Sequence, residues 1–523
     1  MDINDISQIE QAAGFGRSEL FRLGVALLFI IAIMLYSVGS VADVPGSVLL
    51  VVAAMIGGYM AVNIGANDVA NNVGPAVGSR ALTLTGAILI AAIFEGAGAL
   101  IAGGEVVGTI KKGIIDPALI NNTDTFIWVM MGALLSAAVW LNIATALGAP
   151  VSTTHSIVGG VLGAGVAAGG IEIANWGKMS QIAASWVISP VLGGIIAAAF
   201  LYLIKHTITY KKDMSSAAVR MVPLLVALMV WAFGAYLMLK GFKKIWVVDF
   251  SEALMIGLAL AVVVFFIVRP LVKRAAGQLP NEKASVNRLF TLPLIGAAAM
   301  LSFAHGANDV ANAVGPLAAI NEAILHGAVA AKAAIPLWVM MVGAIGIALG
   351  LALYGPKLIR TVGSEITELD QSRAFCIAMA AAITVIIATQ FGLPVSSTHI
   401  AVGAVFGVGF LREYLKASHA KRIDEIKSHH HGADEEVVET YLGRFEAASV
   451  FDKGIMLEEL KKQAAASGLS KKERKNLKRI YRTELVKRAA LLKIVAAWLI
   501  TVPASAALSA LFFFTIRGMM LEH

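Results

Sequence analysis

One eleven-residue motif occurs twice in the chain and constrains the fold more than any other feature. Residues 65–75 read GANDVANNVGP and residues 306–316 read GANDVANAVGP, so the two copies differ at one position. Each copy follows directly on a long apolar run, which places a carboxylate, Asp68 or Asp309, at membrane depth. An ionised Asp there costs about 2.5–3.5 kcal/mol on insertion scales, so such residues are candidates for a functional site. A site that occurs twice suggests one pocket built from two halves.

The composition agrees with an integral membrane protein. The 523 residues are 58% hydrophobic and 15% charged, whereas a soluble domain is about half apolar and about a quarter charged. The net charge is +8, but Lys and Arg concentrate between the apolar runs. This distribution is typical of membrane topology and not of nucleic-acid binding. Cys376 is the only cysteine, so no intrachain disulfide can form.

The apolar runs predict an all-α polytopic membrane protein with about 12–13 transmembrane helices, since each span needs about 20 residues. The runs 47–79 and 289–319 are too long for one span, so we expect a helix broken at the motif in each. The glycine-rich runs 150–170 and 394–411 are expected to form half-helices or hairpins. The complete set of runs is 20–42, 47–79, 83–103, 127–147, 150–170, 181–204, 222–239, 251–272, 289–319, 334–354, 374–391, 394–411 and 491–515.

Lys and Arg in the short loops predict the orientation of these spans. With the N-terminus in the cytoplasm, most basic loops and the polar segment 412–490 lie inside. On this count the two broken helices run in opposite directions. The chain is then built from two inverted-topology repeats, an arrangement common in secondary transporters. We expect a multi-pass protein of the cell inner (plasma) membrane.

A second motif supports the internal repeat. Residues 150–155 (PVSTTH) match residues 394–399 (PVSSTH) in five of six positions, and the offset of 244 is close to the 241 of the first motif. Two ordered motifs at nearly one spacing predict a repeat. The expected organisation is an N-terminal polar segment with an extra helix (1–46), a first repeat (47–170), connecting transmembrane helices (171–288), a second repeat (289–411), a cytoplasmic helical insert (412–490), and a last helix with the C-terminus (491–523).

The second motif predicts an anion site at two helix starts. Proline suits the first helical turn, and a helix start leaves about four backbone N–H groups unpaired. In the bilayer those donors need a partner, which a tetrahedral oxyanion supplies. A simpler interpretation is that the hydroxyls only cap buried helices, but the duplication favours the site. The candidate oxyanion ligands are Ser152, Thr153, Thr154, Ser396, Ser397 and Thr398.

The first motif predicts a cation site. A carboxylate and Asn carbonyls make an all-oxygen shell for a cation, and a protonated Asp would serve proton coupling equally. A simpler interpretation is hydrogen bonding between helices. The candidates for this coupling-ion and substrate site are Asn67, Asp68, Asn71, Asn308, Asp309 and Asn312. Sodium at Asp68 and Asp309 is the only candidate metal, and no cofactor is expected.

Other polar residues at membrane depth are weaker candidates. Glu95 lies inside the run 83–103, and we consider it for coupling or gating together with His155 and His399. Buried histidines more often serve as hydrogen-bonding residues than as ligands or proton relays. His305 is interpreted in this simpler way.

The paired GANDVAN and PVS(S/T)TH motifs, one of each per half and in the same order, resemble the inorganic phosphate transporter (Pit) family over most of residues 47–411. The resemblance implies a symporter, not an enzyme, that imports inorganic phosphate by alternating access around a midplane site. It implies that the hydroxyl residues of the second motif hold phosphate, free or as a metal–phosphate complex. The partners it implies are a coupling cation, the lipid bilayer and, as a candidate, a second copy in a homodimer, with no nucleic acid.

The resemblance also bears on the coupling ion. Sodium-coupled animal members of the family carry Glu ahead of the second PVS motif, at the position where this chain has Ala378. We therefore expect protons rather than sodium. Three other functions remain open: a sulfate symporter of the same fold, an intramembrane aspartyl hydrolase using Asp68 and Asp309, and an ion channel. The duplicated helix starts have no role in aspartyl hydrolysis, and a channel predicts flux without coupling.

Overall fold

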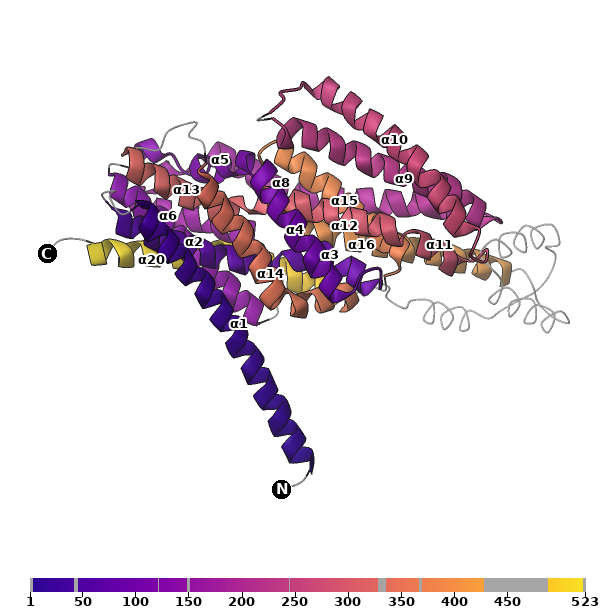
Figure 1. The fold of residues 1–523 in the computed structure, drawn as a ribbon, viewed down its shortest axis with the longest axis horizontal. Coiled ribbons are helices and arrows are strands. Elements are labelled where there is room, and N and C mark those ends of the chain that lie inside the picture. Colours follow the sequence, from indigo (N-terminus) through magenta and orange to yellow (C-terminus); the bar gives the residue numbers. More distant parts are fainter. Residues whose placement is uncertain are drawn as a thin grey trace.

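The computed structural model describes residues 3–41, 46–120, 122–147, 151–243, 245–327, 335–365, 369–427 and 488–520. These residues are helical almost throughout, and the expected all-α class is confirmed. Figure 1 shows the helices packed side by side, with the N-terminal part of α1 projecting from the body. The helices are α1 (Ile3–Val41), α2 (Ser47–Asn67), α3 (Val69–Gly78), α4 (Leu84–Ala102), α5 (Gly104–Lys112), α6 (Thr123–Ala146), α7 (Thr153–Gly169), α8 (Trp176–Ile204), α9 (Met214–Tyr236), α10 (Phe250–Ala276), α11 (Lys283–Leu289), α12 (Thr291–Asp309), α13 (Ala311–His326), α14 (Leu337–Glu365), α15 (Gln371–Gln390), α16 (Ser397–Lys427) and α20 (Arg488–Met520).

Ten of the described helices are long and apolar enough to cross a membrane, or up to eleven if a bent pair counts as one span. The bent pair corresponds to the apolar run 289–319. Two further runs of the sequence, 150–170 and 394–411, form α7 and the first part of α16 and do not pass as spans. This difference accounts for the lower number relative to the twelve to thirteen helices expected from the sequence.

Both long apolar runs are interrupted at the first motif, as expected. α2 gives way to α3 at Asp68, and α12 gives way to α13 at Val310. Pro75 and Pro316 lie inside the following helices, where each ring removes the backbone hydrogen bond to the residue four positions earlier. The described pair that bends by more than 40° is α11 with α12–α13, at 43°. The helix axis therefore bends by less than 40° at each motif.

The second motif forms two helix starts inside the molecule. The first residues of α7 and α16, Thr153 and Ser397, are fully buried. In each case the preceding serine side chain accepts a hydrogen bond from the backbone N–H three positions further on. This is the usual capping role of serine. A helix start in this motif was predicted correctly, but the proline was expected in the first helical turn, whereas α16 begins at Ser397, three residues after Pro394, because Ser396 caps the helix.

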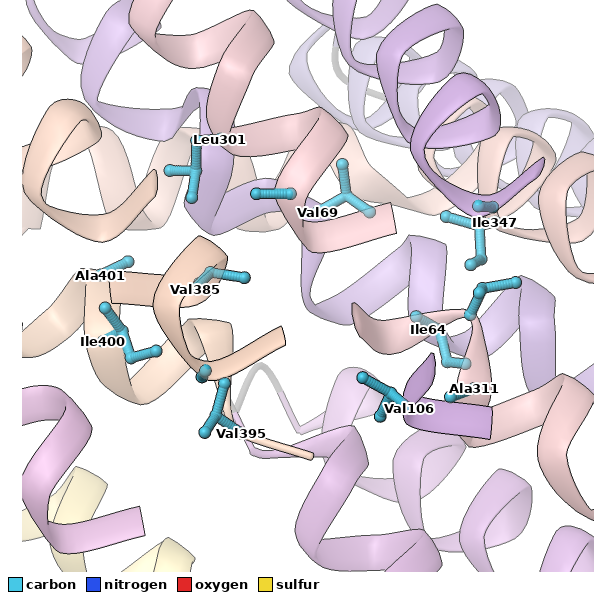
Figure 2. Packing of buried hydrophobic residues seen from close by; sticks show 14 of the residues in the cluster. Ile64, Val69, Val106, Leu301, Ala311, Ile347, Val385, Val395, Ile400 and Ala401 are labelled. Carbon is cyan, nitrogen blue, oxygen red and sulfur yellow. The ribbon is translucent and has the colours of Figure 1, made fainter. Parts of the chain in front are cut away.

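Glycines allow the motif helices to cross their neighbours at backbone contact. A Cβ on Gly306 of α12 would collide with the backbone carbonyl of Glu95 in α4, and a Cβ on Gly65 of α2 would collide with that of Ile347 in α14. Figure 2 shows Ile64 and Ile347 among the buried hydrophobic residues of this region. The crossing of α12 with α4 therefore matches the crossing of α2 with α14.

Other helices pack around the motif helices and their crossings. α9 and α10 pack against each other along the outer edge of the molecule (Figure 1). α1 packs on α2, where the side chain of Ile33 lies against Gly58. The predicted insert begins as a continuation of α16 to Lys427, and its residues 428–487 lie outside the described residues. The division into repeats and connecting helices stays a prediction.

Candidate functional site

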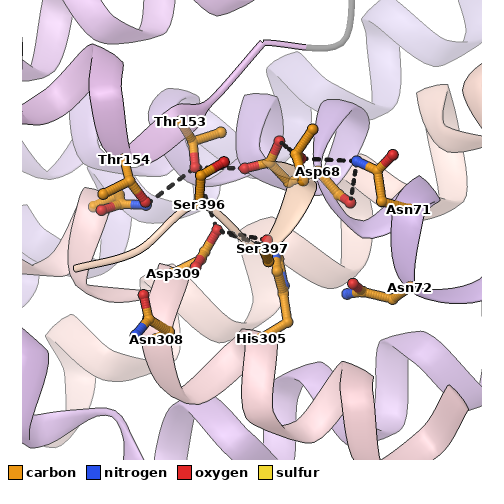
Figure 3. Close-up of polar contacts among 12 residues, drawn as sticks. Asp68, Asn71, Asn72, Thr153, Thr154, His305, Asn308, Asp309, Ser396 and Ser397 are labelled. Atoms are coloured by element: carbon orange, nitrogen blue, oxygen red, sulfur yellow. Dashed lines mark hydrogen bonds and ion pairs between the residues drawn. The ribbon is translucent and has the colours of Figure 1, made fainter. Parts of the chain in front are cut away.

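Asp68 lies in a buried polar cluster formed by both motifs (Figure 3). Its two carboxylate oxygens accept hydrogen bonds from two hydroxyls. Thr153 donates to Oδ2 at 2.6 Å and Thr398 donates to Oδ1 at 2.8 Å. Thr153 belongs to the helix start of α7 and Thr398 to that of α16. One carboxylate therefore joins the two helix starts.

Asp309 lies in the same cluster but is bound differently. The hydroxyls of Thr153 and Ser397 approach its Oδ2 only to 3.4 Å. The same oxygen is 3.1 Å from Nε2 of His305. Ligand atoms of Asp68, His305 and Asp309 all lie within 4.8 Å of one another. This spacing would allow one cation to contact both carboxylates.

Two asparagines of the first motif link each half to the other. Asn71 Nδ2 donates to Thr398 Oγ1 at 2.8 Å. Asn312 Nδ2 donates to Thr154 Oγ1 at 3.1 Å and to Thr153 Oγ1 at 3.0 Å. Each asparagine therefore reaches the helix start that follows the other copy of the motif. The predicted cation and anion residues form one cluster and not two.

Asn67 and Asn308 bind threonines that were not among the predicted site residues. Asn67 Nδ2 donates to Thr145 Oγ1 at 2.9 Å, and Asn308 Nδ2 donates to Thr389 Oγ1 at 3.0 Å. The two threonines are 244 residues apart, the offset of the second motif. That matching offset is the sequence signal by which they could have been found.

A chain of polar contacts leads from Asp309 to α4. Glu95 is fully buried, and its Oε2 lies 2.6 Å from Nδ1 of His305. Its Oε1 accepts a hydrogen bond from Nδ2 of Asn72 at 2.7 Å. His305 therefore bridges Glu95 and Asp309, which the sequence interpretation missed. The sequence does carry a signal for this role. His305 lies four residues before Asp309, on the same helix face, and the residue at the equivalent position before the first copy of the motif is Ile64.

The two histidines of the second motif make aromatic contacts. The ring of His155 lies 3.8 Å from that of Trp186, and the ring of His399 lies 3.5 Å from that of Trp498, measured between centroids. The two imidazoles meet edge to face at 4.4 Å. A gating role for these histidines stays a prediction.

Three of the six hydroxyls predicted for the oxyanion have partners that fix the fold. Ser152 and Ser396 accept the capping hydrogen bonds of α7 and α16. Thr154 donates to the backbone carbonyl of Val395 at 2.9 Å. The simpler capping interpretation therefore describes part of the motif. The hydroxyls that face the carboxylates are those of Thr153, Ser397 and Thr398.

Buried acceptor oxygens without a partner gather in the same cluster. Among the described residues, Oδ1 of Asp309 and the amide oxygens of Asn71 and Asn312 have no hydrogen-bond partner. Buried polar atoms are usually paired, so these oxygens are available to accept a partner from outside the chain. A cation suits a set of oxygen acceptors.

Comparison with known proteins places these residues in a wider context. A model of the Phosphate transporter family matches residues 64–509. A Helicobacter pylori (strain J99) protein named as a phosphate permease is 55% identical over 524 residues, 98% of each chain. A Pyrococcus abyssi protein of the same designation is 40% identical over 365 residues, 69% of this chain and 89% of its own. A solved structure titled "The sodium-dependent phosphate transporter" is 33% identical, with a TM-score of 0.74, and the match covers 91% of this chain and 100% of that one.

Proposed function

Because the chain belongs to the phosphate transporter family, we propose that it imports inorganic phosphate by symport with a cation. It is a multi-span membrane transporter and not an enzyme. We further propose that the buried cluster around Asp68 and Asp309 binds both the cation and the phosphate.

The observation that carries the proposal is the bonding of Asp68 to hydroxyls of both helix starts. While both carboxylates are ionised, they repel an anion, and the hydroxyls of Thr153 and Thr398 donate to Asp68. A cation at Asp68 and Asp309 would neutralise that charge, an effect that is large in a site shielded from water. The hydroxyls and backbone N–H groups of the helix starts would then donate to phosphate. Neither ligand binds well alone, which is the requirement for coupling.

We propose a proton as the coupling ion. The reason is Ala378, which lies where sodium-coupled animal members of the family carry Glu. Sodium is the second candidate, supported by a similar structure whose title names sodium dependence. Uptake of phosphate into proteoliposomes, measured against external sodium at fixed pH and then against pH without sodium, separates the two. Strict sodium dependence would overturn the proton proposal.

Alternating access around the cluster completes the proposal. The matched crossings of α12 with α4 and of α2 with α14 support two repeats, and we propose that these are inverted and that they move against each other. The N-terminus and the segment 412–490 would face the cytoplasm, and the membrane would be the inner (plasma) membrane. A metal–phosphate complex as the transported species and a homodimer stay predictions of the family resemblance.

The anion is tested by competition. We expect excess arsenate to inhibit phosphate uptake by the reconstituted protein and excess sulfate to leave it nearly unchanged. Arsenate shares the charge and geometry of phosphate, whereas sulfate carries no proton to donate to a carboxylate. Inhibition by sulfate but not by arsenate would replace the phosphate proposal with a sulfate symporter of the same fold.

A further inference from the structure

The short helix α5 contacts the loop that joins α15 to α16. This loop consists of residues 391–396 and ends at the helix start of α16; we call it the α15–α16 loop. The hydroxyl of Thr109 in α5 donates to the backbone carbonyl of Gly392 at 2.7 Å. The two residues are 283 positions apart, so only the fold brings them together. Neither belongs to the residues that are proposed to hold the cation and the phosphate.

The α15–α16 loop also contacts the transport site directly. Asn308 of the first motif donates from Nδ2 to the carbonyl of Leu393 at 3.1 Å, and its Oδ1 accepts a hydrogen bond from the backbone N–H of Val395 at 3.3 Å. The hydroxyl of Thr154 donates to the carbonyl of Val395 at 2.9 Å. The loop therefore lies against the buried cluster, and hydrogen bonds from α5, α7 and α12 fix its position.

The first half of this loop is held by few apolar contacts. Phe391 is 70% exposed, and Gly392 and Leu393 are only half-buried. Gly392 has a φ of +62°, a conformation that glycine adopts without a steric penalty. Segments with few buried apolar contacts open more easily than the core of a protein. The bond from Thr109 is therefore one of a small number of contacts that keep this part of the loop in place.

α5, in contrast, is firmly attached to the body of the molecule. Ile110 is fully buried where α5 packs on α13. At the start of the helix, Glu105 Oε1 lies 3.0 Å from Nζ of both Lys240 and Lys243, which follow α9. Glu105 and Thr109 are four positions apart and share one face of α5. The ion pairs therefore fix the face from which Thr109 reaches the loop.

The two halves of the molecule differ in how far the site is covered. Thr389 and Thr145 bind the equivalent asparagines of the two halves. Thr389 is fully buried, whereas Thr145 is only half-buried. Ile386, one turn before Thr389, is half-buried, whereas its counterpart Asn142 is exposed. With the repeats inverted as proposed, these two places face opposite sides of the membrane, and the site is the more closed on the side of α5.

We propose that Thr109 is a positioning residue for transport. It holds the α15–α16 loop against α5 while the site is closed on that side, and release of the bond to Gly392 lets the loop move away and open the site. One hydrogen bond contributes little enough to stability to be broken and remade in every cycle. The inference rests on the proposed function for the transported ion, but the movement of the loop is measurable without transport.

The first experiment measures this movement by cysteine labelling of the purified full chain in phosphatidylcholine nanodiscs. Cys376→Ala removes the only native cysteine. Val395 is fully buried (Figure 2), so the thiol of Val395→Cys should react with a charged methanethiosulfonate only when the loop moves away. In this background Thr109→Val should raise the labelling rate about two- to tenfold, the shift that loss of one hydrogen bond allows. Thr109→Ser keeps the hydroxyl and should restore the slow rate.

Thr123→Val is the matched control. The Thr123 hydroxyl donates to the carbonyl of Gly327 at 3.0 Å, and Gly327 also has a positive φ, of 66°. The variant therefore removes the same kind of bond away from the loop and should leave the labelling rate unchanged. If Thr109→Val does not fold, Glu105→Gln takes its place, because loss of the ion pairs loosens α5 and should also speed labelling. A rate equal to that of the control would overturn the proposal.

The second experiment asks whether transport requires the loop to move. A Cβ on Gly392 would lie 3.6 Å from Thr109 Oγ1, which is close enough for a disulfide between the two positions. In Thr109→Cys/Gly392→Cys, also with Cys376→Ala, oxidation should abolish phosphate uptake by proteoliposomes and reduction should restore it. Each single variant should not respond to oxidation. Undiminished uptake by the oxidised double variant, with the disulfide verified by mass spectrometry, would contradict the proposal.

The two experiments separate this inference from the proposed function. If the unmodified chain takes up no phosphate, the proposed function is wrong, and the labelling rates still decide whether Thr109 holds the loop. If uptake is normal and the labelling rate of Thr109→Val equals that of its control, the role of Thr109 is wrong and the proposed symport stands. A purely structural bond would lower the midpoint of thermal unfolding in Thr109→Val without faster labelling.

Discussion

At one crossing α12 packs on α4 through Gly306, and at the other α2 packs on α14 through Gly65. The match extends one turn further, because Gly98 of α4 meets the carbonyl of Phe303 just as Gly350 of α14 meets that of Val62. The two crossings therefore have the same backbone geometry. Their buried side chains have opposite character. The polar residues of the first crossing and their apolar counterparts in the second are Glu95 and Ile347, His305 and Ile64, and Asn72 and Ala313.

This difference makes the two motif carboxylates unequal. Asp309 lies beside a buried acid–imidazole pair, with His305 Nε2 at 3.1 Å. Asp68 has an isoleucine at the equivalent place and is held by two hydroxyls at 2.6 and 2.8 Å. The two crossings therefore share a backbone shape, while the side chains beside the two carboxylates differ in chemistry. Four predictions test this comparison.

The largest effect is expected at the carboxylates themselves. Asp68→Asn and Asp309→Asn should each abolish concentrative phosphate uptake, because a neutral amide cannot balance a cation. Uptake by proteoliposomes measures this, and the amount of inserted protein is the control. Near-normal uptake by both variants would remove the carboxylates from the mechanism.

Removal of one member of the buried polar pair should destabilise the protein. His305→Ile removes the imidazole partner of Oε2 of the buried Glu95 and leaves only the hydrogen bond from Asn72, and breaking a buried ion pair in this way costs about 3–5 kcal/mol. The triple variant Asn72→Ala/Glu95→Ile/His305→Ile gives this crossing the apolar residues of the α2–α14 crossing, which we call the apolar crossing. We expect this variant to recover stability but not uptake. Thermal unfolding and uptake of the two variants are compared. Normal uptake by the triple variant would show that the polar crossing has no part in transport.

Backbone contact at the two crossings predicts equal effects in the two halves. Gly306→Ala and Gly65→Ala each place a Cβ against a backbone carbonyl, and overpacking of this kind costs about 1–3 kcal/mol or prevents folding. Gly96→Ala is the control, because Gly96 lies in α4, the helix that Gly306 contacts, and a Cβ at Gly96 meets open space. Thermal unfolding of the three variants gives the result. A large loss of stability in only one of the two variants Gly306→Ala and Gly65→Ala would contradict the matched geometry of the crossings.

The smallest effect is expected at the apolar crossing. Ile64→Val and Ile347→Val each remove one buried methylene, which costs about 0.5–1.5 kcal/mol. The dependence of uptake on the coupling cation should not change, since no polar contact is altered. Measurement of uptake against cation concentration checks this. A shifted cation dependence would mean that the apolar crossing also contributes to coupling.

Much of the architecture follows from the two motifs and their spacing. The interruption at Asp68 and a helix start within each copy of the second motif were predicted, because serine and intramembrane polar residues act through local backbone chemistry. The glycine-rich runs 150–170 and 394–411 were counted among the twelve to thirteen spans, although half-helices or hairpins were considered for them; they form α7 and the first part of α16, and neither passes as a span. These features depend on residues that are neighbours in the chain.

The pairing of side chains across the molecule could not be predicted in this way. Glu95 and His305 are 210 residues apart, and only the packing of α4 on α12 brings them together. The bond from Asn71 to Thr398 likewise joins residues 327 positions apart. Periodicity and propensity carry no information on such contacts. For that reason His305 was interpreted as an ordinary buried histidine, and the inequality of Asp68 and Asp309 was not foreseen.

Concentrative uptake tests the central claim most directly. Proteoliposomes that contain the purified chain are given labelled phosphate with an imposed cation gradient, first of protons and then of sodium. The account predicts that internal phosphate rises above the external concentration under one of these gradients and falls back when the gradient is collapsed. It also predicts no accumulation by Asp68→Asn or Asp309→Asn. Phosphate that only equilibrates, whatever the gradient, would contradict symport and indicate a channel.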